Sequence, residues 1–191
     1  PLRTRWPQGW LPLDTCNPHV DKIAPFTQRY DWEALRRDIV ANGGIRNSVL
    51  VAHMPTETSA NASGTTNGLY PVRELTLIKT DNQRVNYWAA PDSDTLADQY
   101  QSAWDIPTKD MTEMYAIVQK WTDQGISADF YRRVIGDASI SSSELIEDYL
   151  YRVKLGLKSK YYMNQKTSNG MQAVADVAQA PAAPAAQLGV Q

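Results

Sequence analysis

Hydroxyl side chains gather directly after an apolar run in this chain. The run at residues 48–52 is followed by a turn-like segment made of Pro55, Thr56, Glu57, Thr58 and Ser59. Hydroxyls and the unpaired N–H groups at a helix start donate hydrogen bonds, and the helix dipole adds partial positive charge. Such a segment suits a phosphate group. Ordinary helix caps and loops have the same composition, so both interpretations stay open.

Glu57 is the unusual member of this segment, because a carboxylate repels phosphate. It is better suited to accept hydrogen bonds from a sugar hydroxyl or from neighbouring amides.

Two adjacent tyrosines, Tyr161 and Tyr162, are the second feature with chemical potential. A phenol is protonated at neutral pH, so its oxidation removes an electron and a proton together. Two stacked phenols would allow a radical to move between them. Neighbouring side chains of an ideal strand point to opposite faces, so stacking requires an irregular backbone. The alternative is ordinary half-buried packing of two residues with high β-propensity.

Other catalytic chemistries find little support in the sequence. Cys16 and the two histidines, His19 and His53, show no spacing typical of a nucleophile–base pair, and they are too few to favour a zinc site. The chain has no glycine-rich loop of the Walker or dinucleotide-binding type.

The elements that would position these residues follow from periodicity. Asp31 is expected to cap a helix that ends at residues 42–44, and residues 47–53 are predicted to form a buried strand that leads into the hydroxyl-rich segment. Residues 72–86 predict a hairpin or irregular strands, with a turn at residues 81–83.

Helices are predicted at residues 92–104, 108–124 and 141–157, the last with a capping box from Ser141 to Glu144. Short strands are expected at residues 125–129 and 158–164. The alternation predicts an α/β fold with some parallel pairing. The small number of strands indicates the last part of a larger barrel or sheet rather than a complete fold.

Composition bounds the class of protein. With 191 residues, a net charge of −2 and a pI near 5.7, the chain gives no electrostatic reason to expect nucleic acid or an anionic membrane as a partner. A single cysteine fits a reducing, cytoplasmic environment. We expect one domain at residues 1–170 and a flexible Ala/Pro-rich tail at residues 171–191.

A resemblance to a known family covers roughly Trp10 to Lys166 and is carried by seven segments in a consistent order: 30–36 (YDWEALR), 45–48 (IRNS), 54–59 (MPTETS), 67–68 (NG), 119–121 (QKW), 123–128 (DQGISA) and 160–165 (KYYMNQ). They resemble the C-terminal part of the catalytic large (alpha) subunit of class I ribonucleotide reductase. The resemblance implies a ten-stranded α/β barrel built from two half-barrels, of which this chain would supply the last strands and helices, an incomplete barrel on its own.

The resemblance also implies a reaction and two sites. The family replaces the ribose 2′-hydroxyl of ribonucleoside diphosphates by hydrogen through a thiyl radical, which supplies deoxyribonucleotides for DNA replication. The residues that match its phosphate-holding loop are Pro55, Thr56, Glu57, Thr58 and Ser59. Tyr161 and Tyr162 match its stacked tyrosine pair, the last radical relay before the active-site cysteine.

The implied partners are the remaining N-terminal part of the large subunit, a small (beta) subunit with a metal-based radical cofactor, and thioredoxin or glutaredoxin as reductant. No cofactor is expected in this chain. The family's catalytic cysteines belong to segments that the chain does not contain, so we expect a fragment or one piece of a split subunit, inactive alone. The alternative is a non-catalytic nucleotide-binding or assembly protein that retains the fold.

Overall fold

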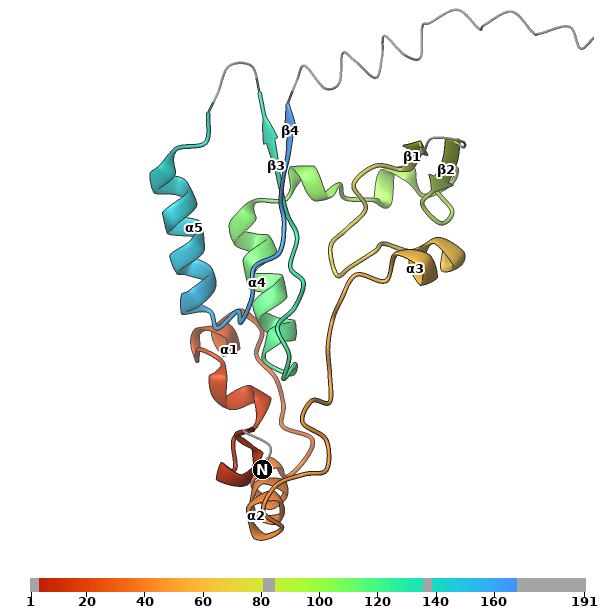
Figure 1. The fold of residues 1–191 in the computed structure, drawn as a ribbon. Helices are drawn as coiled ribbons and strands as arrows, with labels where there is room; N and C mark the ends of the chain where they lie inside the picture. The colour runs from red at the N-terminus through yellow and green to blue at the C-terminus, as the bar shows by residue number, and fades with distance from the viewer. Residues whose placement is uncertain (1–3, 81–84, 136–138, 168–191) are drawn as a thin grey trace, which may run out of the picture.

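The computed structural model describes residues 4–80, 85–135 and 139–167, which form a mixture of helices and short strands (Figure 1). The helices are α1 (His19–Ile23), α2 (Trp32–Ala41), α3 (Glu57–Ser63), α4 (Thr108–Gln119) and α5 (Ser142–Lys154). The strands are β1 (Thr76–Thr80), β2 (Val85–Ala89), β3 (Phe130–Val134) and β4 (Met163–Thr167). The predicted turn at residues 81–83 and the predicted tail at residues 171–191 lie outside the described residues.

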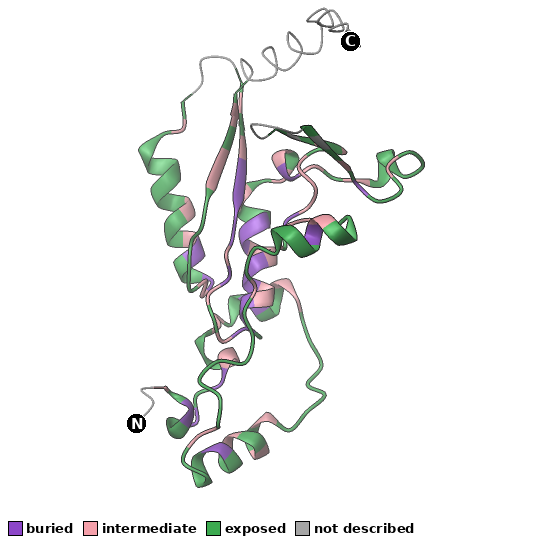
Figure 2. Ribbon diagram, turned by 45° about the vertical axis from the view of Figure 1, so that its right-hand side comes forward, coloured by how far each residue is buried: buried purple, intermediate pink, exposed green. Residues whose placement is uncertain are grey.

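The elements spread over an elongated shape (Figure 1). Helices α1 and α2 lie at one end, α4, α5 and the β3–β4 pair form the central body, and α3 and the β1–β2 hairpin lie to one side. Figure 2 shows buried residues along α4 and β3, whereas α2, α3 and the hairpin are mostly exposed. No helix in the described ranges combines the length and the apolarity that crossing a membrane requires.

The core lies between α4 and β3. Its largest fully buried side chains include Tyr115 and Met111 of α4 and Phe130 of β3. Helix α5 covers the other side of Phe130 with Arg152, whose guanidinium carbon lies 3.7 Å from the ring centroid. Met111 and Tyr115 are one helical turn apart and both are buried, so α4 packs an apolar face against β3.

Strands β3 and β4 pair in parallel, with α5 as the connection between them, and β1 and β2 form an antiparallel hairpin. These are two separate two-stranded sheets, and the described residues contain no closed barrel. The prediction of an α/β fold with some parallel pairing is therefore confirmed.

Two predicted caps are confirmed. The Asp31 side chain accepts a hydrogen bond from the N–H of Ala34 at 2.8 Å and so caps the N-terminus of α2. Ser141 and Glu144 form the reciprocal capping box at the start of α5. Helix α2 ends where Gly43 adopts a φ of 71°, a left-handed conformation that favours glycine.

The strand predicted at residues 47–53 is wrong. These residues form no strand ladder, and Val49, Leu50 and Val51 are exposed. The physical reason is that the N–H groups of Leu50 and Val51 donate to the carboxylate of Asp123, where a strand would offer backbone carbonyls.

The helix predicted at residues 92–104 is also wrong, since only 3₁₀ turns form there, at Ala97–Gln99 and Ala103–Asp105. Tertiary hydrogen bonds override its helical periodicity. The N–H of Ala103 donates to the carbonyl of Val72 at 2.8 Å, and the Ser102 hydroxyl donates to the carbonyl of Arg73 at 3.0 Å.

The strand predicted at residues 125–129 is wrong, because these residues follow an irregular backbone and β3 begins only after them, at Phe130. The strand expected at residues 158–164 begins later, at Met163, as β4. Helix α4 ends at Gln119 rather than at residue 124. The Gln119 amide nitrogen donates to the carbonyls of Thr122 and Gln124, which stabilises a turn in place of further helix.

Candidate functional site

The hydroxyl-rich segment leads into α3. Thr56 is the residue before the helix, and its N–H donates to the carbonyl of Asn67 at 3.0 Å, which closes the segment into a loop. Thr58 and Ser59 lie in the first turn and are exposed to solvent. The first N–H groups of a helix have no acceptor within the helix, so exposed hydroxyls and amide donors are combined here. The helix start that the phosphate interpretation requires is therefore present.

The loop is fixed on its N-terminal side as well. Asp123 accepts the N–H groups of Leu50 and Val51 at 2.6 and 2.7 Å. Further along, the N–H of Ser127 donates to the carbonyl of His53 at 3.0 Å. Residues 50–53 therefore lie along residues 123–127, directly before the hydroxyl-rich segment.

Two pockets flank the loop. One, of about 390 Å³, lies between α3 and the hairpin and includes Glu57 and Arg73 in its lining. The other, of about 220 Å³, lies on the side of residues 52–54 and includes Thr56 in its lining. Thr58 and Ser59 line neither pocket, so these two side chains face open solvent beside them.

The two tyrosine rings are in contact. Their centroids lie 4.1 Å apart with an angle of 52° between the ring planes, so the pair is tilted rather than stacked in parallel. Tyr161 and Tyr162 are 43% and 59% exposed. A hydrogen bond with Tyr162 raises the pKa of the Tyr161 phenol. The irregular backbone that such a contact requires is present, because β4 begins only at Met163.

One segment connects the loop and the tyrosine pair. Residues 123–128 bind residues 50–53 on one side, and on the other side the carbonyl of Ala128 accepts the N–H of Tyr161 at 3.2 Å. The Ser159 hydroxyl adds a hydrogen bond to the carbonyl of Ile126. The structure therefore brings the two predicted sites to opposite sides of a single stretch of backbone.

Sequence reasoning missed two carboxylates of this segment, Asp123 and Asp129. Both accept backbone N–H groups that a strand ladder would otherwise satisfy. Their signal in the sequence is weak: each flanks the short run of residues 124–128, and a solvated acidic residue would have the same appearance.

The remaining residues considered for catalysis show no site. Cys16 is half-buried, and burial raises the pKa of its thiol, which disfavours the reactive thiolate. Within the described ranges, no three His, Cys, Asp or Glu side chains gather in a way that could hold a metal ion.

Comparison with known proteins decides the family. The family model described as "Ribonucleotide reductase, barrel domain" matches residues 3–89 and 78–163 of this chain. The chain belongs to the ribonucleotide reductase barrel-domain family. Both the hydroxyl-rich loop and the tyrosine pair lie within the matched residues.

Curated relatives agree with this membership. The chain is 37% identical over 166 residues to the ribonucleoside-diphosphate reductase subunit alpha of Haemophilus influenzae and to the ribonucleoside-diphosphate reductase 1 subunit alpha of Escherichia coli. It is 35% identical over 173 residues to the subunit alpha of Enterobacteria phage T4. These matches cover 85–87% of this chain but only 22–23% of the relatives, so the chain spans about a fifth of their length.

Proposed function

We propose that this chain is part of the catalytic large subunit of a ribonucleotide reductase, which reduces ribonucleoside diphosphates to deoxyribonucleoside diphosphates. The observation that carries the proposal is the 4.1 Å contact between the Tyr161 and Tyr162 rings, inside the residues that match the family. In this proposal the parallel β3–β4 pair contributes the last strands of a ten-stranded barrel, whose other strands come from the rest of the subunit. The domain would extend over residues 1–170.

The hydroxyl-rich loop would hold the substrate diphosphate. Thr58 and Ser59 would donate their hydroxyls together with N–H groups of the first turn of α3, and Pro55 and Thr56 would shape the entry to that turn. The exposure of the two hydroxyls supports this role, since a phosphate could reach them without displacing other protein groups. Glu57 would contact a ribose hydroxyl or the loop itself.

Substrate affinity tests the loop. Thr58→Ala and Ser59→Ala should each weaken binding of a ribonucleoside diphosphate to the complete large subunit by about tenfold, the loss of one hydrogen bond to a charged group. Ser63→Ala is the matched control. The Ser63 hydroxyl lies at the other end of α3 and donates a hydrogen bond to the backbone carbonyl of Ser59. Unchanged affinity in both loop variants would remove the phosphate assignment.

The tyrosine pair would carry oxidising equivalents. One phenol would lose an electron and its proton to the radical of the small subunit. The resulting phenoxyl radical takes an electron and a proton from the neighbouring phenol. The second phenoxyl then oxidises a cysteine thiol elsewhere in the large subunit to a thiyl radical. The contact between the Tyr161 and Tyr162 rings supports the middle step.

Removal of one phenol hydroxyl tests the relay. Tyr161→Phe should abolish diphosphate reduction by the complete enzyme while substrate affinity changes less than about twofold, because the aromatic ring stays and the side chain is half exposed. Tyr30→Phe is the matched control for an exposed tyrosine away from the pair. Sustained turnover in Tyr161→Phe would contradict the relay role.

The proposed partners complete the reaction. The metal-based radical cofactor would belong to the small subunit, and the described residues of this chain offer no cluster for a metal. The reductant would be thioredoxin or glutaredoxin.

A further inference from the structure

The backbone register changes at the tyrosine pair. The parallel pairing of β3 and β4 begins with Phe130 opposite Met163, and the N–H of Phe130 donates to the carbonyl of Tyr162 at 2.9 Å. One hydrogen bond earlier, the N–H of Tyr161 donates to the carbonyl of Ala128 at 3.2 Å. In a regular parallel ladder, that bond would place position 161 opposite position 129, and position 162 opposite Phe130. Met163 lies there instead, so this strand carries one extra residue, a β-bulge.

The bulge explains how the two rings meet. Both tyrosines lie opposite the single residue Asp129, so the alternation of side chains between the two faces is interrupted at this point. The rings can then approach to a centroid distance of 4.1 Å. The same irregularity leaves the N–H of Tyr162 without a carbonyl of the ladder.

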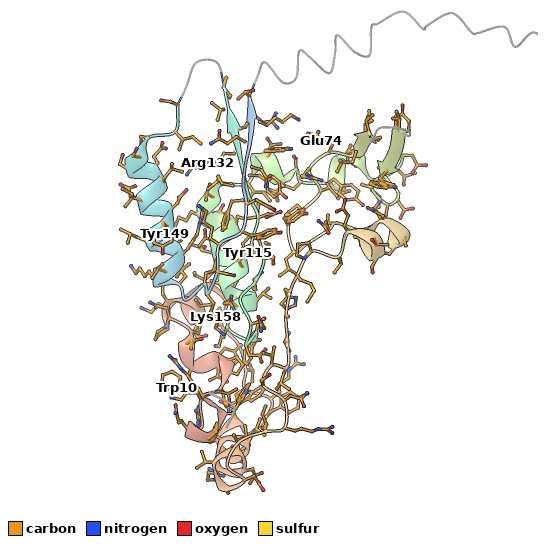
Figure 3. The ribbon with its side chains drawn as sticks, viewed as in Figure 1. Trp10, Glu74, Tyr115, Arg132, Tyr149 and Lys158 are labelled. Atoms are coloured by element: carbon orange, nitrogen blue, oxygen red, sulfur yellow. The ribbon has the colours of Figure 1, made fainter. Side chains whose placement is uncertain are left out.

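The side chain of Asp129 supplies the missing acceptor for this N–H. Its carboxylate Oδ1 accepts the N–H of Tyr162 at 3.1 Å. Asp129 is also fixed to the core, because its backbone carbonyl accepts the hydroxyl of Tyr115 at 2.8 Å, and its Oδ2 accepts a longer hydrogen bond of 3.4 Å from the hydroxyl of Tyr131. Figure 3 shows Tyr115 in the middle of the body, between α4 and the strands.

The surroundings of Asp129 provide hydrogen-bond donors for its side-chain oxygens, but they disfavour a negative charge. The residue is only 9% exposed, and burial raises the pKa of its carboxyl, whereas the hydrogen bonds from the Tyr162 N–H and the Tyr131 hydroxyl lower it. An uncharged side chain of the same shape with one acceptor oxygen therefore fits the same place.

We propose that Asp129 is a positioning residue for the tyrosine pair: its carboxylate accepts the N–H that the bulge releases and so holds the two phenol rings in contact. The expected effect on turnover rests on the relay proposed above, whereas the expected effect on ring geometry does not.

The test compares two substitutions in the complete large subunit. Asp129→Asn keeps an acceptor oxygen for the Tyr162 N–H, and Asp129→Ala removes it. Crystal structures of both variants give the ring separation, and assays with the small subunit give turnover and diphosphate affinity. Asp31→Ala is the matched control, because it removes another carboxylate that accepts a backbone N–H, at the start of α2.

Three results are expected. Asp129→Asn keeps the ring contact and turns over within about twofold of the wild type. Asp129→Ala separates the rings and loses about 100-fold in turnover, the size expected for misplacement by about 1 Å, while diphosphate affinity stays unchanged. Asp31→Ala leaves both the rings and turnover unchanged. Normal turnover in Asp129→Asn, beside the loss in Asp129→Ala, distinguishes a positioning role from a general loss of folding.

Other results would overturn the proposal. An unchanged ring contact in Asp129→Ala, or separated rings in Asp129→Asn, would show that Asp129 does not position the pair. If Asp129→Ala fails to fold, Asp129→Ser takes its place, since its hydroxyl is too short to reach the Tyr162 N–H. Separated rings with unchanged turnover would leave the positioning role intact and contradict the relay instead.

Discussion

Asp123 offers the sharpest test of how the loop is held. Its carboxylate accepts the N–H groups of Leu50 and Val51 at 2.6 and 2.7 Å, and no other side-chain contact described here fixes both. The adjacent backbone bond from Ser127 to the carbonyl of His53 depends on the same alignment of the two segments. Asp123→Ala should therefore loosen the whole approach to the loop, including the Ser127 bond that the substitution does not touch.

The size of the effect follows from the two hydrogen bonds. Asp123 is partly exposed, so each bond contributes about 1 kcal/mol, the typical net value for a hydrogen bond in a protein. Their joint loss lowers the free energy of local opening by about 2 kcal/mol, which corresponds to about 30-fold in an equilibrium constant. Asp123→Asn keeps one acceptor oxygen and should lose about half of that free energy, or about fivefold.

Amide hydrogen exchange on the complete large subunit measures this directly. The N–H of Ser127 should exchange about 30-fold faster in Asp123→Ala and about fivefold faster in Asp123→Asn. Asp31→Ala, which removes a comparable bond at α2, should leave Ser127 unchanged. If Ser127 exchanges at the wild-type rate in Asp123→Ala, then the carboxylate does not hold the two segments together, and the reasoning fails.

Two further predictions concern the ends of helices and the N-terminal turns. The hydrogen bond from Arg36 holds the pKa of Asp14 below its ordinary value, so this contribution to stability is present above about pH 4 and is lost as the pH falls through the lowered pKa. The N–H of Leu11 donates to the Asp14 carboxylate at 2.6 Å and reports on this contribution. The loss of amide protection at Leu11 in Asp14→Asn, corrected for intrinsic exchange, should be constant above about pH 4 and shrink as the pH falls through the lowered pKa. A difference that grows toward acid would contradict the sign. Ser141→Ala removes half of the capping box, so the Glu144 amide should exchange about fivefold faster, the equivalent of about 1 kcal/mol, and an unchanged rate would show that the cap contributes nothing.

Local signals made much of the fold predictable. Helices α2 and α5 follow from an apolar stripe combined with a side-chain cap, Asp31 in one and Ser141 in the other. These signals act within four residues, so they do not depend on the rest of the molecule. The parallel β3–β4 pair was predictable in kind, since a long helix connects the two strands.

Long-range contacts made the rest unpredictable. Residues 47–53 have the composition of a buried strand, yet Asp123, more than seventy residues away, takes the N–H groups that a ladder would use. Residues 92–104 have helical periodicity, yet bonds to Val72 and Arg73 hold them in another conformation. Periodicity carries no information on which distant group will compete for the backbone.

The candidate site also has features that the sequence predicts and features that depend on long-range contacts. Residue types located the hydroxyl-rich loop and the tyrosine pair, and simple strand geometry required an irregular backbone at Tyr161 and Tyr162. The one-residue bulge and the carboxylate of Asp129 that satisfies it could not be predicted, because both depend on the register of two strands separated by α5. A change of one residue in register leaves no trace in composition.

The measurement that tests the central claim most directly is the rate at which the complete large subunit, with its small subunit, converts a ribonucleoside diphosphate to the deoxyribonucleoside diphosphate, compared between wild type and Tyr162→Phe. Diphosphate affinity is determined on the same samples. We predict steady product formation by the wild type, none above background in Tyr162→Phe, and equal affinities. Product formation by Tyr162→Phe at a rate near that of the wild type would contradict the account.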